Sequence, residues 1–130
     1  MKKKPGKLIQ KDPSEEMIAA IVHGIEEKKG KAIQVFDLRQ TPNAVCAFFV
    51  ICNADSGTQV DAIAYEVEHQ VKIATGRSPW HSEGFENKEW ILVDYADIVV
   101  NIFQTQVREF YQIEKLWADA IIGEIPETAA

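Results

Sequence analysis

One stretch of the chain, AVCAFFVIC at residues 44–52, is apolar throughout. It is rich in residues that favour β-strands, and it is far shorter than the roughly 18 to 20 apolar residues that cross a bilayer. A strand that is apolar on both faces lies in the middle of a sheet that is covered on both sides. The run therefore predicts a central strand of an α/β protein. No longer apolar run is present, so we do not expect a membrane protein.

Helical and strand patterns lie on both sides of this run. Ser14 is the predicted N-cap of a first helix, in which apolar residues recur at helical spacing, and a strand is predicted at 32–38. Ser56 and Gln59 have the spacing of a capping box. The apolar stripe behind them ends at Gly76, which predicts a second helix.

The second half of the chain contains the patterns of a hairpin and a last helix. A short edge strand is predicted near Trp80, and two strands at 90–94 and 97–103 are separated by two residues, which is hairpin spacing. A helix is predicted from about residue 106 to 121. The order of these elements predicts an α/β protein of the α+β type, in which helices flank a mixed β-sheet.

The length of 130 residues fits a single domain. We expect the folded domain at residues 14–122, between a flexible lysine-rich tail at 1–13 and a short flexible tail at 123–130. The N-terminal lysines are not followed by the apolar region of a secretory signal. We therefore expect a cytoplasmic protein.

Charge is distributed unevenly along the chain. Five lysines give the first eleven residues a charge of +5, whereas residues 12–130 have 9 basic and 20 acidic side chains, a net charge of −11. An acidic body repels phosphate backbones and attracts basic partners. The acidity either serves solubility alone or predicts a basic partner, and it argues against nucleic-acid binding across the body.

The residues that most enzymes use do not converge in this sequence. The three histidines lack metal-ligand spacing, and no phosphate-binding loop or nucleophile elbow is present. Cys46 and Cys52 would lie about 20 Å apart on one strand at ~3.3 Å per residue, too far for a disulfide. Asp94 and Asp97 lack the D-x-D alternation that directs two carboxylates to one Mg²⁺, and aspartates beside tight turns more often accept backbone N–H bonds. We predict reduced thiols, structural aspartates, no metal, no cofactor and no enzymatic activity.

Aromatic and acidic residues gather near the C-terminal end. On a continuous last helix Tyr111, Glu114 and Trp117 would be neighbours at spacings of three residues, and Trp90 begins a strand that could lie beside that helix. Aromatic residues amid acidic side chains are typical of binding hot spots. We predict Trp90 and Tyr111 as interface anchors, Glu114 as a nearby partner for a cation, and Trp117 as part of the core.

Two motifs in this region are specific. GFENKEWILVDYADIVVNIF begins at residue 84, and VREFYQIEKLWADA follows it. Together they resemble the ribosomal silencing factor (Iojap-related) family, and CAFFVICNADS and VDAIA upstream extend the resemblance to about residues 14–120. The positions that match the family's C-terminal pattern are Gly84, Trp90, Asp94, Asp97, Arg108, Tyr111, Glu114, Leu116 and Trp117.

The resemblance implies a small fold related to nucleotidyltransferases but without their catalytic signature. It also implies binding to protein fourteen of the large ribosomal subunit, which would block association with the small subunit and lower translation during starvation. The residues assigned to partner binding are Trp90, Asp94, Asn101, Tyr111 and Glu114. A contact of the lysine-rich tail with ribosomal RNA and a homodimer of the free protein stay open.

Four positions depart from the family pattern. Ala47 stands in place of Asp, Ala54 in place of Gly, Thr58 in place of a frequent Arg, and Asn101 in place of His. A binding function tolerates such changes, whereas chemistry at these positions would be lost. Two alternatives to the ribosomal function remain: a Mg²⁺-dependent nucleotidyltransferase-like enzyme, and an interaction domain for another basic partner.

Overall fold

The computed structural model describes residues 13–117 and 121–124. The helices are α1 (Pro13–Glu27), α2 (Gly57–Thr75), α3 (Thr105–Tyr111) and the 3-10 helix η2 (Ile113–Trp117). The strands are β1 (Lys31–Asp37), β2 (Phe48–Ala54), β3 (His81–Glu83), β4 (Trp90–Asp94), β5 (Ile98–Gln104) and β6 (Ile121–Glu124). Of the expected tails at 1–13 and 123–130, residues 1–12 and 125–130 lie outside the described residues.

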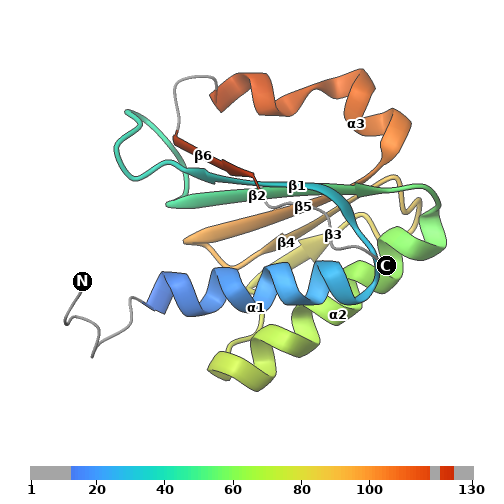
Figure 1. Ribbon diagram of the computed structural model, residues 1–130, viewed down its shortest axis with the longest axis horizontal. Coiled ribbons are helices and arrows are strands. Elements are labelled where there is room, and N and C mark those ends of the chain that lie inside the picture. The colour runs from blue at the N-terminus through green and yellow to red at the C-terminus, as the bar shows by residue number, and fades with distance from the viewer. Residues whose placement is uncertain (1–12, 118–120, 125–130) are drawn as a thin grey trace.

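The strands form one mixed sheet in the order β3-β4-β5-β2-β1-β6. Figure 1 shows α1 and α2 on one face of this sheet and α3 on the other. The prediction of a single α/β domain with a mixed sheet between helices is confirmed. No helix in the described part of the chain is both long and apolar enough to cross a membrane.

β2 is the central strand that the apolar run predicts. All of its residues are buried, and it pairs in parallel with β5 and antiparallel with β1. The strand begins only at Phe48, because the residues before it form a loop in which the N–H groups of Ala47 and Phe48 bond to the Asp97 carbonyl. Cys46 therefore lies in that loop and not on the strand.

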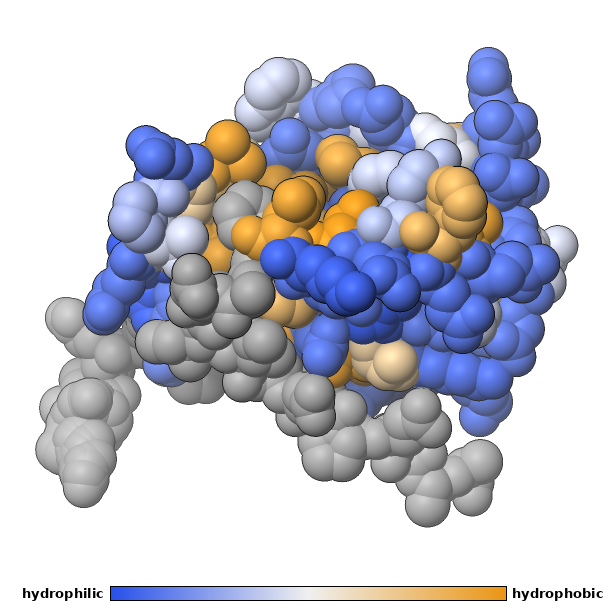
Figure 2. Space-filling model, turned by 90° about the horizontal axis from the view of Figure 1, so that it is seen from above, coloured by the Kyte–Doolittle hydropathy of each residue, from blue (hydrophilic) through white to orange (hydrophobic). Residues whose placement is uncertain are grey.

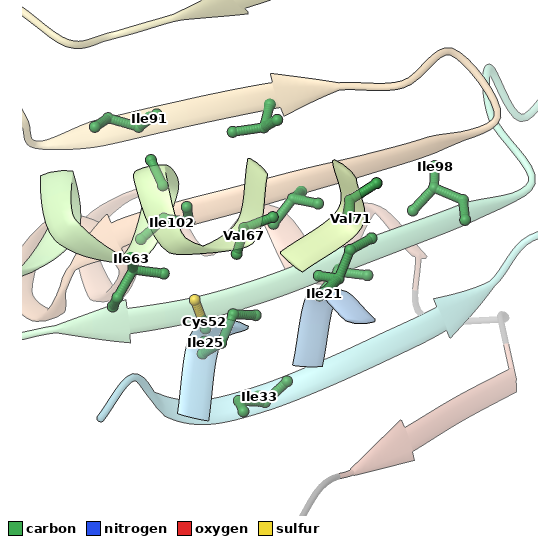
Figure 3. Close-up of a cluster of buried hydrophobic side chains, with 14 of the residues drawn as sticks. Ile21, Ile25, Ile33, Cys52, Ile63, Val67, Val71, Ile91, Ile98 and Ile102 are labelled. Carbon is green, nitrogen blue, oxygen red and sulfur yellow. The ribbon is translucent and has the colours of Figure 1, made fainter. Parts of the chain in front are cut away.

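The larger core lies between the sheet and the pair α1 and α2. Figure 3 shows aliphatic side chains from both helices meeting those of the strands, among them Ile21, Ile63 and Val67. The two helices approach closely at Gly24, where an added Cβ would lie 2.8 Å from the Val67 Cα. Only glycine fits this crossing without a shift of the backbone.

The ends of α2 are as predicted, whereas the start of α1 is not. Ser56 accepts the Gln59 N–H at 3.1 Å, and Gly76 closes the helix in the left-handed conformation at φ 78°. The Gln59 side chain also donates to the Lys28 carbonyl at 3.0 Å, which ties α2 to the end of α1. α1 begins at Pro13, so Ser14 lies in its first turn and the predicted N-cap is wrong. Proline favours the first helical position because its φ is preset and its missing N–H is not needed there.

The last predicted helix is also wrong. α3 ends at Tyr111, because Gln112 adopts the left-handed conformation at φ 49°, and η2 follows. The chain then returns as β6, which pairs antiparallel with β1. The C-terminal tail that we expected from Gly123 therefore begins inside a strand, which covers the outer edge of β1.

Candidate protein-binding face

The side of the sheet that carries α3, here called the α3 face, holds a second and smaller core. Its buried members are Phe36, Leu38, Phe49, Ile51 and Phe103, and the half-buried Trp90, Val107 and Ile113 pack around them. α3 has only 7 residues, compared with 15 and 19 in the helices on the other face. The 3-10 helix η2 continues the cover of this face after α3 (Figure 1), and its Ile113 packs on the same core.

Trp90 and Tyr111 meet on this face, as the sequence predicts. The Trp90 ring stacks on Phe103 at a centroid distance of 4.7 Å and lies 5.6 Å from the Tyr111 ring. Gly84 allows Trp90 this position, because an added Cβ at Gly84 would lie 2.1 Å from the Trp90 carbonyl oxygen, and Gly84 has φ 99°. The stacked rings form a rigid aromatic platform.

Large apolar side chains stand exposed beside this platform. Phe110 is 79% exposed, Tyr111 54% and Leu116 73%. Figure 2 looks onto this side of the molecule and shows apolar side chains gathered in its middle, with hydrophilic ones around them. The Phe110 and Tyr111 rings are in contact, with centroids 5.0 Å apart, and exposed apolar side chains that lie together mark sites where proteins bind other macromolecules. We call Trp90, Phe110, Tyr111 and Leu116 the aromatic surface.

Asn101 supports the aromatic surface from within. It is only 1% exposed, and its Oδ1 accepts the Trp90 indole N–H at 2.9 Å. A buried side chain cannot touch a partner directly, so the predicted surface role of Asn101 is wrong. Asn101 instead fixes the orientation of the Trp90 ring.

Glu114 is occupied by a cation of the same chain. Because the helix ends at Tyr111, Glu114 is not its neighbour on one helix, and its Oε2 accepts the Arg108 Nε–H at 3.1 Å. Arg108 is itself buried, with only 8% of its surface exposed. Its guanidinium also donates to Asn53 Oδ1 at 2.7 Å. We predicted that Glu114 meets a cation of a partner. Its Oε2 oxygen is instead paired with Arg108 of the same chain.

Arg108 is the residue that the sequence-based site missed. Its guanidinium donates to the Ala32 carbonyl at 2.7 Å and to Gln34 Oε1 at 3.0 Å, besides Asn53 and Glu114. These hydrogen bonds connect α3 to the first half of β1 and to the end of β2. The signal was present in the family motif, where Arg108 precedes Tyr111 by three residues.

Asp94 lies away from the aromatic surface. It is at the opposite end of β4 from Trp90, and its Oδ1 accepts the Ala96 N–H at 2.7 Å. Asp97 pairs with Arg77 at 2.9 Å. The turn role predicted for Asp94 is confirmed, and the structure does not bring Asp94 together with Trp90 and Tyr111. The predicted core position of Trp117 concerns a side chain outside those described.

The groups that could carry chemistry are few in the described ranges. Both cysteines are free, and burial raises the pKa of the Cys46 thiol to about 11 and that of Cys52 to about 12. Such thiols stay protonated at neutral pH and are poor nucleophiles. Among residues 13–117 and 121–124, no group of three or more His, Cys, Asp or Glu side chains is placed to hold a metal ion.

The fold and the aromatic surface together define a small mixed α/β domain with one exposed apolar face. A sequence model of the RsfS family, described as "Ribosomal silencing factor during starvation", matches residues 11–130, and the chain belongs to this family. The resemblance seen in the sequence motifs is thereby confirmed.

Individual relatives agree with this assignment. A ribosomal silencing factor RsfS from Halalkalibacterium halodurans is 33% identical over 112 residues, which cover 86% of this chain and 94% of the relative. One from Bacillus subtilis is 35% identical over 100 residues, which cover 77% of this chain and 83% of the relative. The crystal structure of a Chromobacterium violaceum protein, 33% identical, superimposes with a TM-score of 0.74 and covers 89% of this chain and 92% of its own.

Proposed function

We propose that this protein lowers translation by binding protein fourteen of the large ribosomal subunit through its aromatic surface. The bound protein would occupy a contact that the small subunit needs, and so keep the two subunits apart. The mechanism is steric occupation, with no bond chemistry and no cofactor, in the cytoplasm. Family membership supports the ribosomal role.

The observation that carries the proposal is the exposed aromatic surface. Phe110, Tyr111 and Leu116 are each more than half exposed, beside a Trp90 ring that stacks on a buried core residue. Exposed aromatic side chains on a rigid support are the common anchors of protein interfaces, since they bury much area at little cost in conformational entropy. Such a surface suits a protein partner better than a small substrate.

Charge supports a basic partner. Residues 12–130 carry a net charge of −11, and proteins that fold among ribosomal RNA are generally basic. Complementary charge raises the association rate and disfavours wrong partners, whereas the apolar centre of an interface supplies most of the affinity. The aromatic surface and the acidic body thus have separate tasks in the same complex.

Tyr111→Ala tests the proposal, with Tyr65→Ala as a matched control. Both tyrosines are exposed, 54% and 65%, but Tyr65 is on α2, which covers the other face of the sheet. Loss of an aromatic anchor costs about 2 kcal/mol or more, so Tyr111→Ala should bind large subunits roughly 30-fold more weakly in co-sedimentation and should permit subunit joining. Tyr65→Ala should bind like the wild type.

Two results would contradict the proposal. Equal loss of binding in both variants would show that the α3 face is not the interface. Unchanged binding by Tyr111→Ala, with thermal unfolding like that of the wild type, would remove Tyr111 as an anchor. The same variants tested on isolated protein fourteen decide whether that protein is the partner within the subunit.

A further inference from the structure

The short helix α3 is attached to the sheet by a charged residue. Among its 7 residues, all of which the structure describes, only Arg108 is buried, and Val107 adds a half-buried contact. An isolated helix shorter than about 12 residues is marginal in water, so α3 depends on its contacts with the sheet. Its N-cap also lacks a side-chain hydrogen bond. The contacts of Arg108 therefore determine how firmly α3 is held.

Four acceptors surround the Arg108 guanidinium, and we call them the arginine socket. They are the Ala32 carbonyl, Gln34 Oε1, Asn53 Oδ1 and Glu114 Oε2, at 2.7 to 3.1 Å. These acceptors belong to β1, β2 and η2, so one side chain joins three elements to α3. A guanidinium presents its N–H groups in a fixed planar fork and fits such a set of acceptors in one orientation.

The backbone of β1 is shaped for this socket. The pairing of β1 with β2 shifts between Lys31 and Gln34, and Ala32 has φ 52°, which L-residues rarely adopt. A bulge turns backbone groups out of the ladder, and here the Ala32 carbonyl accepts from Arg108 Nη1 at 2.7 Å. A conformation that costs free energy persists only where other contacts compensate for it. The hydrogen bond to Arg108 is such a contact.

The aromatic surface is built from two parts of the fold. Trp90 lies on β4, whereas Phe110 and Tyr111 lie on α3 and Leu116 lies on η2. Arg108 precedes Tyr111 by one helical turn, so the residue that attaches α3 is close to the residue that meets the sheet. The Tyr111 ring is 5.6 Å from the Trp90 ring only in this position of the helix.

We propose that Arg108 is the positioning residue of the aromatic surface. Bound in the arginine socket, it holds α3 so that Tyr111 lies against Trp90. Without that attachment α3 loosens and the surface loses three of its four members, while the domain stays folded. The larger core, as far as the structure describes it, contains no residue of α3. The effect of Arg108 on partner binding rests on the proposed function, whereas its effect on the surface does not.

The Trp90 indole N–H resonance of the ¹⁵N-labelled full chain reports on the position of Tyr111. Trp90→Phe assigns the resonance by removing it, and Tyr111→Ala should shift it, because a neighbouring ring is lost. Arg108→Lys keeps the charge, but one ammonium cannot replace the fork at four acceptors. In Arg108→Lys the resonance should move from its wild-type position toward its position in Tyr111→Ala. A resonance that stays at the wild-type position would overturn the proposal.

Arg77→Lys is the matched control. Arg77 also donates several hydrogen bonds to protein acceptors, but at the other end of β4 from Trp90. It should leave the indole resonance unchanged, and an equal shift in both lysine variants would count against the proposal. Gln34→Leu is a milder variant that removes one acceptor of the arginine socket. It should shift the resonance in the same direction by less, and it decides the matter if Arg108→Lys does not fold.

Binding kinetics on large subunits separate positioning from contact. If α3 is docked in only a fraction of the molecules, the apparent affinity falls by that fraction. For a docked fraction of about one tenth, Arg108→Lys should associate about tenfold more slowly and dissociate at the wild-type rate. Tyr111→Ala should instead dissociate faster, because it loses a contact. Faster dissociation of Arg108→Lys with unchanged association would show that Arg108 acts on the partner directly, which would overturn the proposal.

The two proposals fail separately, because the indole measurement contains no ribosomal component. If Tyr111→Ala leaves subunit binding unchanged, the proposed function fails, and the shift in Arg108→Lys still establishes what positions the surface. If Tyr111→Ala weakens binding but Arg108→Lys leaves the indole resonance in place, the proposed function stands and the role of Arg108 falls.

Discussion

The hydrogen bond from the Trp90 indole to Asn101 is the residue-scale contact on which the aromatic surface depends. Asn101 Oδ1 accepts the indole N–H at 2.9 Å, and the Asn101 side chain is buried. A partner that met a freely rotating indole would have to immobilise it on binding. Because Asn101 holds the edge of the indole ring and Phe103 packs on its face, binding loses little further conformational entropy at this side chain.

A double-mutant cycle measures this contact. Trp90→Phe keeps an aromatic ring but leaves Asn101 Oδ1 buried without a donor, which should cost about 1–3 kcal/mol in the free energy of unfolding. Asn101→Leu should also destabilise the protein, since it leaves the indole N–H unpaired. The double variant removes both partners, so in urea unfolding it should lose about 1 kcal/mol less than the sum of the single variants. Strict additivity would show that the two side chains do not interact.

The ion pair of Asp97 with Arg77 predicts a pH dependence. The hydrogen bond from the Arg77 guanidinium, opposed by partial burial, lowers the pKa of the Asp97 carboxyl below its usual value. A carboxyl whose pKa is lower in the folded state stabilises the fold above its unfolded pKa, about 4, and loses that effect as the pH falls through its folded pKa.

Asp97→Asn should therefore lower the urea midpoint at pH 7 by a small amount, because the pair is partly exposed to solvent. The difference from the wild type should shrink at pH 3. Glu86→Gln, an exposed change of the same charge, serves as the control. A difference of the same size at both pH values would mean that Asp97 acts through something other than its charge.

At the scale of elements, the crossing of α1 and α2 sets a strict limit on one position. Gly24→Ala places a methyl group against the α2 backbone, where the Val67 Cα lies 2.8 Å from the ideal Cβ position. Overpacking of this kind costs about 1–3 kcal/mol, which exceeds the ~1 kcal/mol that alanine contributes through helix propensity. We expect a lower melting temperature. A higher melting temperature, as propensity alone would give, would refute the close approach.

Elements with their own local signals were predictable from the sequence. β2 followed from an uninterrupted apolar run, and α2 from a cap at each end. The end of α3 was not predictable, because Gln112 adopts a left-handed conformation that glycine or asparagine usually signals. β6 was missed because its residues continue a helix-compatible pattern, and only the open edge of β1 makes them a strand.

The candidate site divides in the same way. Trp90 and Tyr111 come together because β4 pairs with β5 in the sheet and α3 follows β5 directly in the chain. The position of Glu114 was predicted wrongly because the helix was expected to continue past Tyr111. The burial of Asn101 was not predicted, because the residues next to it on its strand do not reveal that the Trp90 side chain covers it. Arg108 acts through four partners that are distant in sequence or follow a turn, and no local pattern could have assigned them.

At the scale of the whole molecule, the N-terminal lysines and the acidic body have opposite charges, so their effects on binding can be tested separately. Deleting residues 2–11 removes five positive charges and leaves an acidic body. Binding to isolated protein fourteen should be as tight as before, and its association rate should depend more steeply on salt, since exposed charges are screened beyond about 8 Å at 0.15 M.

Surface-based binding kinetics across a range of salt concentrations check this prediction. Weaker binding to whole subunits alone would assign the lysines to ribosomal RNA. Loss of binding to the isolated protein would show that the acidic body is not what attracts the partner.

The place of β6 in the sheet has a consequence for the order in which the chain is made. β1 emerges early during synthesis, yet its outer edge is paired by residues 121–124, which follow everything else that the structure describes. Until those residues leave the exit tunnel, the nascent domain presents a strand edge with unpaired N–H and C=O groups, which is open to pairing with other chains. A product interrupted before Ile121 keeps that edge unpaired, so it stays open to pairing with other chains.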